Sequence, residues 1–260
     1  MMRKFWYGTI AALCVVCLAS CDKEDDAKVL SKEAAITSFT FDPAVEANAI
    51  VTSQPVINGN TITFTVDGLA DAESIDALQP TIKVSEGAYI SSFSGSFNLG
   101  MTYTVTAEDG VTQNTYTANC TGSIFDVYSG VLEVALNGTT LVEGAPYNIS
   151  LEKQSDTELM IYIRDFTITI ESMATTIPLG DVEIICTVAK TADGYTFNGS
   201  KDLGIIEVPI LGNTVSAHCV VNVENASVVG GTFTLPMKID VLDGALTVDA
   251  NFVGTPMQVE

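Results

Sequence analysis

The chain has 260 residues, of which 47% are hydrophobic and 17% charged, and its formal net charge is −21. So negative a charge excludes nucleic-acid binding, because contact with phosphates requires clustered cations. The apolar share excludes a disordered chain, which combines high net charge with low hydrophobicity. The length allows one or two domains.

Residues 1–20 are typical of an export signal. Arg3 and Lys4 precede an apolar run from Phe5 to Ala19, which is shorter than the roughly 20 residues that a membrane-spanning helix needs. The run ends in Leu-Ala-Ser-Cys21, which resembles the lipobox of bacterial lipoproteins. This resemblance implies that the chain is cut before Cys21, and that the acylated Cys21 anchors the protein to a membrane.

Residues 21–33 are predicted to form an acidic tether. The run Asp-Lys-Glu-Asp-Asp directly follows Cys21, and a run of charge stays solvated and extended. It also resembles the signal that sends Bacteroidota lipoproteins to the outer face of the outer membrane. We therefore expect a lipid-anchored, surface-exposed protein of the outer membrane, with a position in the inner leaflet as the alternative.

Residues 34–122 are predicted to form an antiparallel β-sandwich of immunoglobulin-like size. Ile62, Phe64 and Val66 alternate with threonines, as in strands with one buried face. Asn58-Gly59 and Asp109-Gly110 are hairpin-turn signals. The segment 103–116 resembles the closing hairpin of Ig-like modules that stand between the anchor and a distal domain in such lipoproteins.

Residues 124–260 continue the alternation in sets of apolar residues, each of which predicts a strand. These sets span 132–136, 147–151, 159–163, 166–170, 182–188, 215–223, 233–241 and 246–252. About eight antiparallel strands with no helical pattern predict a closed up-and-down barrel, which leaves no exposed edge.

The alternation changes parity between Ile163 and Phe166. A one-residue slip moves every following side chain to the other face of the sheet, so a regular strand cannot contain it. The sequence therefore predicts a bulge or a corner at Arg164-Asp165.

The second domain resembles the calycin-like β-barrel of Bacteroidota lipoproteins. The residues that carry the resemblance are Tyr-Ser-Gly-Val-Leu-Glu-Val from 128, Arg-Asp-Phe from 164, residues 177–184 and the final Phe252-Val-Gly254. The Gly-x-Trp signature of lipocalins is missing, since the single tryptophan, Trp6, lies in the export signal. The resemblance implies the fold but supplies no ligand chemistry.

The sequence predicts no catalytic residue, no metal site and no cofactor. His218 is the only histidine, and alternation places it on the outer face, away from Ala217 and Cys219. No hydrolase elbow, zinc spacing or calcium loop is present. We interpret His218 as a solvent-facing strand residue, and the protein as a binding or interaction module rather than an enzyme.

Apart from the cysteines of the export signal and the anchor Cys21, the chain contains Cys120, Cys186 and Cys219. An odd number in an exported protein leaves at least one free thiol. Cys186 and Cys219 both fall on inward faces, where they either form a disulfide or stay as buried free thiols.

Three binding hypotheses remain for an unidentified protein or small-molecule partner. The first is a surface interaction module carried on an Ig-like spacer. The second is a carrier of a small apolar ligand, which requires a barrel cavity of about 300 Å³ or more. The third is an accessory glycan-binding protein, with Tyr162 as the candidate platform because it faces opposite to Ile161 and Ile163; its alternative role is cross-strand packing.

Overall fold

The computed structural model describes residues 29–136, 138–170, 175–210, 213–241, 244 and 246–257. The predicted export signal, Cys21 and most of the tether lie outside these residues. The segment Ser31–Glu260 is one compact unit. Among the described residues, no helix is long and apolar enough to cross a membrane.

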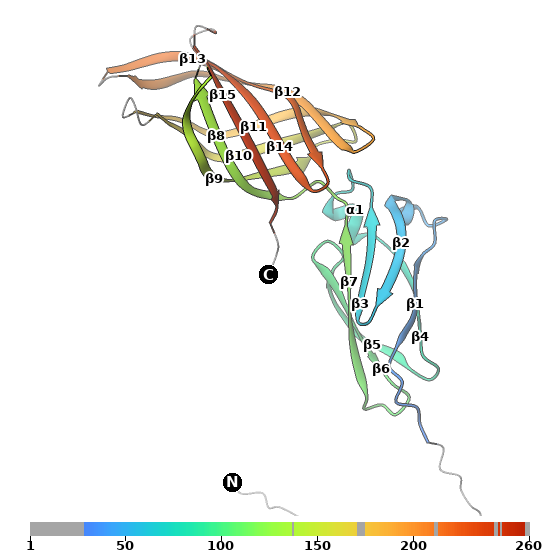
Figure 1. Ribbon diagram of the computed structural model, residues 1–260. Helices are drawn as coiled ribbons and strands as arrows, with labels where there is room; N and C mark the ends of the chain where they lie inside the picture. The colour runs from blue at the N-terminus through green and yellow to red at the C-terminus, as the bar shows by residue number, and fades with distance from the viewer. Residues whose placement is uncertain are drawn as a thin grey trace, which may run out of the picture. The chain divides into compact units, whose positions relative to one another are not determined.

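The N-terminal β domain contains a two-stranded and a five-stranded sheet (Figure 1). The smaller sheet pairs β1 (Ile36–Phe41) with β4 (Pro80–Val84). The larger has the order β2 (Val51–Asn58), β3 (Thr61–Val66), β7 (Gln113–Thr121), β6 (Gly100–Thr106) and β5 (Tyr89–Ser96). A short 3₁₀ helix, η1 (Glu46–Ile50), and a single-turn helix, α1 (Ala72–Asp76), connect strands.

The predicted alternation and turns of this domain are confirmed. Ile62, Phe64 and Val66 are buried in a core of aromatic and aliphatic side chains, whereas Thr61 and Thr63 are exposed. Gly59 adopts a φ of +58° in the turn between β2 and β3, a conformation that glycine reaches without steric cost.

The larger sheet is mixed, which corrects the prediction of a purely antiparallel sandwich. β3 pairs with β7 in parallel, from Thr61 opposite Thr117 to Thr65 opposite Thr121. Between β3 and β7 the chain first forms β4, which belongs to the two-stranded sheet, and then β5 and β6, which belong to the larger sheet. Alternation reports which face of a strand is buried and carries no information on the direction of its neighbour.

The C-terminal domain is a closed barrel of eight antiparallel strands, in the order β10-β11-β12-β13-β14-β15-β8-β9 (Figure 1). The strands are β8 (Val127–Leu136), β9 (Thr139–Lys153), β10 (Glu158–Ile170), β11 (Thr175–Lys190), β12 (Gly194–Ile210), β13 (Asn213–Val229), β14 (Thr232–Val241) and β15 (Leu246–Pro256). β15 pairs with β8 from Val248 opposite Leu136 to Pro256 opposite Tyr128. The predicted up-and-down barrel is confirmed.

The number of strands was right, but two of the predicted strands were assigned wrongly. The sets 159–163 and 166–170 belong to one strand, β10, while β12 was missed. The sequence of β12 contains Gly199, Gly204 and Pro209, with Lys201 and Asp202 between them, so its apolar positions do not form a clean alternating set.

The predicted irregularity at Arg164-Asp165 is confirmed as a bulge in β10. The register against β11 shifts between Ile163 and Phe166, and Asp165 has a φ of +48°. Ile163 and Phe166 consequently both point inward and are fully buried. The bulge restores the inward alternation after the parity change.

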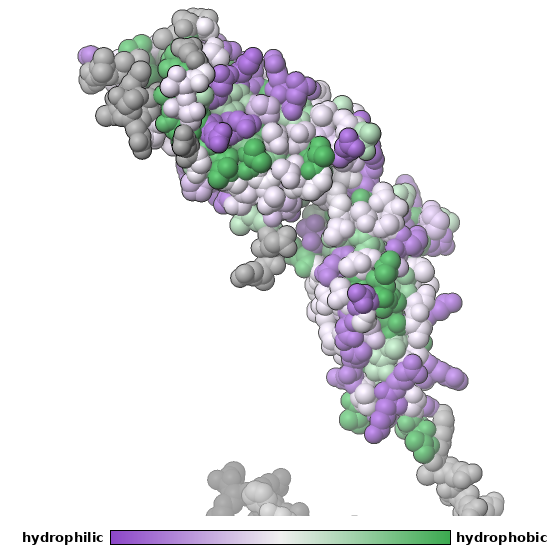
Figure 2. Space-filling view, viewed as in Figure 1, coloured by the Kyte–Doolittle hydropathy of each residue, from purple (hydrophilic) through white to green (hydrophobic). Residues whose placement is uncertain are grey.

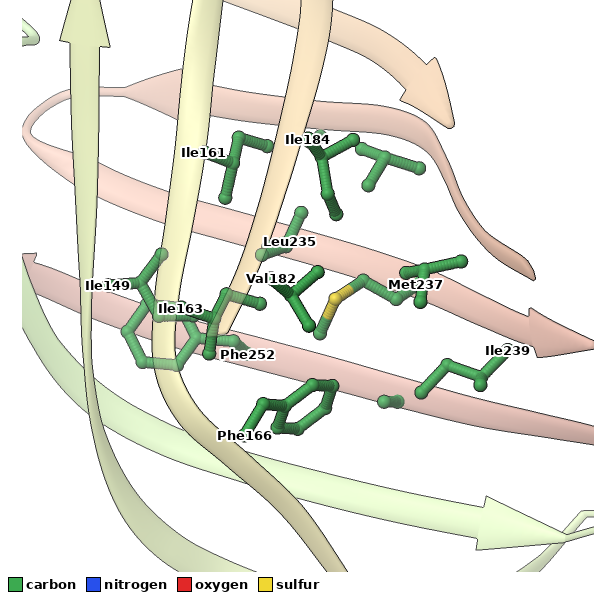
Figure 3. Close-up of a cluster of buried hydrophobic side chains, with 14 of the residues drawn as sticks. Ile149, Ile161, Ile163, Phe166, Val182, Ile184, Leu235, Met237, Ile239 and Phe252 are labelled. Carbon is green, nitrogen blue, oxygen red and sulfur yellow. The ribbon is translucent and has the colours of Figure 1, made fainter. Parts of the chain in front are cut away.

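Side chains fill the interior of the barrel. The inward side chains form one buried hydrophobic cluster, and Figure 3 shows part of it, with aliphatic, aromatic and thioether side chains from several strands gathered in one region. Phe166, Val182 and Phe252 have no exposed surface. Residues of alternate strands interdigitate in this way in small barrels, whose interior is just wide enough for side chains.

The visible outer surface of the barrel is mixed in hydropathy. Figure 2 shows mostly residues of intermediate hydropathy on this face, with strongly hydrophilic and apolar side chains in separate patches. Small patches are ordinary on a soluble surface, so the candidate site has to be found from its geometry and chemistry rather than from exposed apolar area.

Candidate functional site

The ladder between β9 and β10 covers only part of the two strands. Pairing runs from Lys153 opposite Leu159 to Ile149 opposite Ile163 and stops at the bulge. Beyond this point β9 continues to pair with β8, and β10 with β11. The barrel wall therefore has an interruption between β9 and β10, next to Arg164 and Asp165.

Tyr147 bridges this interruption with its side chain. Its hydroxyl donates a hydrogen bond to the carbonyl oxygen of Thr167 (3.0 Å) and accepts one from the backbone N–H of the same residue (3.3 Å). Its ring meets Phe166 edge-on at 5.8 Å between ring centroids. The phenol thus satisfies a backbone donor and acceptor that a continuous ladder would have paired.

A groove of about 420 Å³ lies over the interruption. We call it the Tyr162 groove; it is lined by Val127, Pro146, Tyr147, Asn148, Ser150, Tyr162, Arg164 and Asp165. Two phenol rings, a guanidinium, an amide, a hydroxyl and a carboxylate therefore surround one concave surface.

Asp181 on β11 holds Tyr162 and the bulge in place. Its Oδ2 accepts a hydrogen bond from the Tyr162 hydroxyl (3.0 Å), and its Oδ1 accepts one from the backbone N–H of Asp165 (2.8 Å). The pKa of Asp181 lies below its ordinary value. The main cause is the hydrogen bond from the Asp165 N–H, followed by the bond from the Tyr162 hydroxyl and the charge of Arg164. Donors to the charged form favour it, so Asp181 is a stable carboxylate.

The guanidinium of Arg164 lies over the Tyr162 ring, with its Cζ 5.7 Å from the ring centroid. An arginine over an aromatic face is held by the ring quadrupole, and a hydrogen bond to Tyr162, followed by the charges of Asp181 and Asp165, raises the pKa of Arg164. The sequence analysis had weighed Tyr162 as a platform or a cross-strand packing residue, and had named Arg164 as part of the bulge and of the calycin-like resemblance. The structure brings the two together.

The sequence analysis missed the part played by Tyr147, which it assigned to the inward set 147–151. The inward assignment holds, since Tyr147 packs against the barrel core, but its half-buried side chain also lines the groove. Pro146 was the available signal, because a proline inside a strand cannot donate to a ladder and marks an edge or an interruption.

The fold and the groove can be compared with known proteins. Residues 124–255 match the family model described as calycin-like β-barrel domain. The chain belongs to the calycin-like β-barrel domain family. Residues 36–120 match the model of the N-terminal domain of SGBP, a surface glycan-binding protein of Bacteroidota. No curated protein matches the chain.

Two solved structures are similar to the chain. One is a provisionally assigned outer membrane protein of Bacteroides fragilis, 14% identical, with a TM-score of 0.33; the match covers 67% of this chain and 72% of that one. The other is a provisionally assigned glycoside hydrolase of Bacteroides thetaiotaomicron, 15% identical, with a TM-score of 0.30; here 88% and 94% are covered.

The calycin-like barrel holds Cys186 and Cys219 as buried free thiols, so the disulfide considered for this pair is not formed. The two cysteines lie on β11 and β13, which β12 separates. Cys186 is opposite Gly199 and Cys219 opposite Gly204, about five residues or 16 Å apart along β12. A disulfide requires Cα atoms within about 7 Å.

His218 lies on the outer face of the calycin-like barrel, as predicted. Its Nε2 is 2.9 Å from Oδ1 of Asp202 on the neighbouring strand. The Gly204 N–H, and then His218, lower the pKa of Asp202. Among the described residues, no group of three or more His, Cys, Asp or Glu side chains could hold a metal ion.

Proposed function

We propose that this protein is a lipid-anchored glycan-binding protein on the outer surface of the outer membrane, and that it binds a saccharide in the Tyr162 groove without cleaving it. The match of residues 36–120 to the surface glycan-binding model supports the ligand class. The lipobox-like sequence at Cys21 supports the anchor. The observation that carries the proposal is the groove itself.

The groove has the chemistry that a saccharide requires. Sugar rings present apolar C–H faces and polar hydroxyl edges, and a phenol ring offers an apolar body with a polar tip. Arg164 presents several donors in a fixed plane, while Asn148 and Ser150 supply further donors and acceptors. Apolar surface with a few placed polar groups is the usual composition of a small-ligand site.

The groove is already ordered before a ligand binds. Asp181 fixes the Tyr162 hydroxyl and the Asp165 backbone, and Thr167 fixes the hydroxyl of Tyr147. Side chains that are already immobilised lose little conformational entropy on binding. This preorganisation favours affinity for a rigid ligand such as a sugar ring.

The electrostatics of the groove favour binding over hydrolysis. Most glycosidases need a carboxyl group of raised pKa as the general acid, beside a second carboxylate. Asp165 is the one carboxylate among the described residues that line the groove, so the lining offers no carboxyl pair. Asp181 on β11, which holds Tyr162, has a lowered pKa, because its oxygens accept hydrogen bonds that stabilise the charged form. We therefore expect the protein to retain oligosaccharides without releasing shorter products from them.

The filled barrel interior does not favour the carrier hypothesis. The inward side chains, some of which are drawn in Figure 3, form one buried cluster, and Ile161, Ile163 and Ile184 have no exposed surface. An apolar ligand would have to displace close-packed side chains, at the cost of their contacts.

Binding can be tested with residues 31–260, which form the compact unit. The protein is screened on a glycan array, and the hits are measured by affinity electrophoresis in gels that contain the polysaccharide. We expect Tyr162→Ala and Arg164→Ala to weaken binding about tenfold or more. The matched control is Lys201→Ala, an exposed cation on β12 outside the groove.

Unchanged binding in both groove variants, alongside a glycan bound by the wild type, would contradict this site. Tyr162→Phe separates the two roles of the side chain. It keeps the ring and loses the hydrogen bond to Asp181, so we expect a loss smaller than that of Tyr162→Ala.

A further inference from the structure

A second hollow of about 290 Å³ lies on the outer wall of the calycin-like barrel, across β13, β14, β15 and β8. We call it the Lys238 cleft; its polar lining includes Glu133, Glu224, Asn225, Lys238, Asp249 and Asn251. None of these residues lines the Tyr162 groove.

The register of the strands brings these side chains together. Lys238 is directly opposite Asp249, and Asn251 on the same strand as Asp249 is directly opposite Glu133. Ala135 is the other neighbour of Asp249. Its methyl group is much shorter than the side chains around it, and this difference in length leaves room for a ligand above it.

A bulge in β13 forms one rim of the cleft. The register against β14 shifts between Val223 and Ser227, and Asn225 has a φ of +58°. The backbone N–H of Asn225 is bound by the side-chain oxygen of Asn198 at 2.9 Å, which stabilises this conformation. Bulges re-aim side chains and are frequent next to binding sites; this one places Glu224 and Asn225 at the cleft.

Several polar side chains of the cleft form no ion pair or hydrogen bond with one another. Opposite charges at directly opposed positions of a sheet commonly pair, yet Lys238 has no carboxylate within ion-pair distance among the described residues, although it faces Asp249. Within the same part of the chain, the side chains of Glu133, Glu224 and Asn251 make no hydrogen bond to protein. Donors and acceptors therefore converge on the cleft with their capacity free.

The charge of the cleft selects against anions. Three carboxylates, Glu133, Glu224 and Asp249, stand against the single ammonium group of Lys238. Like charges repel phosphate, sulfate and uronate groups. A ligand that both donates and accepts hydrogen bonds without carrying negative charge fits this surface, and the ring of Pro236 adds a flat apolar face.

We propose that the Lys238 cleft is a second saccharide site, which binds an uncharged sugar unit or short oligosaccharide through its hydroxyl groups. Its volume lies near the lower end of small-ligand sites, which suits a short saccharide. Two sites on one barrel would bind one polysaccharide chain twice, and the second contact would then profit from a raised effective concentration.

The test uses residues 31–260 with three classes of soluble probe: neutral gluco-, xylo- and manno-oligosaccharides, oligogalacturonate as the anion, and chitosan oligosaccharides as the cation. Isothermal titration gives the affinity and the number of sites. We expect the neutral probes to include a ligand whose affinity falls about tenfold or more in Lys238→Ala and in Asn251→Ala. The matched controls Lys201→Ala and Thr255→Ala, both exposed on the barrel wall, should leave it unchanged.

Each outcome assigns the two sites separately. A loss caused by Asn251→Ala and Lys238→Ala but not by Tyr162→Ala supports the cleft and overturns the groove. A loss caused by Tyr162→Ala alone overturns the cleft. Losses from both sets, with two sites per chain in the titration, support both. Binding of the anionic or the cationic probe that depends on Lys238 or Asn251, without binding of a neutral probe, overturns the proposal, and no binding of any probe overturns both sites.

Discussion

Phe166→Ala is the substitution that tests whether the barrel interior is packed. Phe166 lies directly after the bulge, has no exposed surface and contacts Tyr147 edge-on. Truncation of a fully buried phenylalanine in a close-packed core typically costs about 3–5 kcal/mol, since transfer energy is lost and a cavity remains. At roughly 2–4 °C per kcal/mol for a chain of this size, the melting temperature should fall by about 6–20 °C.

Urea unfolding followed by circular dichroism measures this free energy for residues 31–260. The matched control is Phe93→Ala, the same change at a ring that is 71% exposed on β5, for which we expect a change within about 0.5 kcal/mol. A loss below about 1 kcal/mol for Phe166→Ala would refute the reasoning, because it would mean that the interior has room to spare. Such a result would favour a hollow barrel and therefore the carrier hypothesis.

Two further predictions concern the barrel seam and the thiols. Gly130→Ala on β8 should destabilise the barrel by about 2–3 kcal/mol in urea unfolding, since the new Cβ would collide with the backbone of Val253 and Gly254 on β15; unchanged stability would mean that the β8–β15 contact is looser than described. Burial raises the pKa of Cys186 to about 12 and of Cys219 to about 11, from an ordinary 9.0. Between pH 9 and these values the unfolded chain loses protons that the folded chain keeps, so stability should fall as pH rises through this window, and both thiols should resist maleimide labelling at pH 8 until the protein is unfolded. Cys120 is a third free thiol and only half-buried, so fast labelling of the native protein beyond one adduct per chain, read from the intact mass, would contradict the burial of Cys186 and Cys219.

The strands of the barrel were largely predictable from alternation, because burial of one face imposes a period of two on the sequence. The bulge at Asp165 was predictable for the same reason: a parity change leaves no other way to keep Ile163 and Phe166 both inside. β12 could not be predicted in this way, because glycine, proline and charged residues interrupt its apolar alternation. The parallel pairing of β3 with β7 could not be predicted either, because the alternation of a strand does not depend on the direction of its neighbour.

The candidate sites were less predictable than the strands that carry them. Tyr162 was recognisable as an outward ring, but its partners come from three strands, with Tyr147 on β9, Arg164 on β10 and Asp181 on β11. The Lys238 cleft left no sequence signal at all, since Lys238, Asp249 and Glu133 are each an ordinary outward residue of a half-buried strand.

The sequence by itself determined the all-β class, the eight-stranded barrel and most of the side chains that enter it, while the export signal and the lipid anchor at Cys21 stay predictions. These properties are local, since they depend on composition and on the spacing of neighbours along one strand. Only the tertiary structure decided that the β9–β10 ladder stops at the bulge, that Cys186 and Cys219 lie too far apart to bridge, and that polar side chains from separate strands converge in two hollows. These properties depend on register between strands far apart in the chain, which pairing and packing set together and which no single strand encodes.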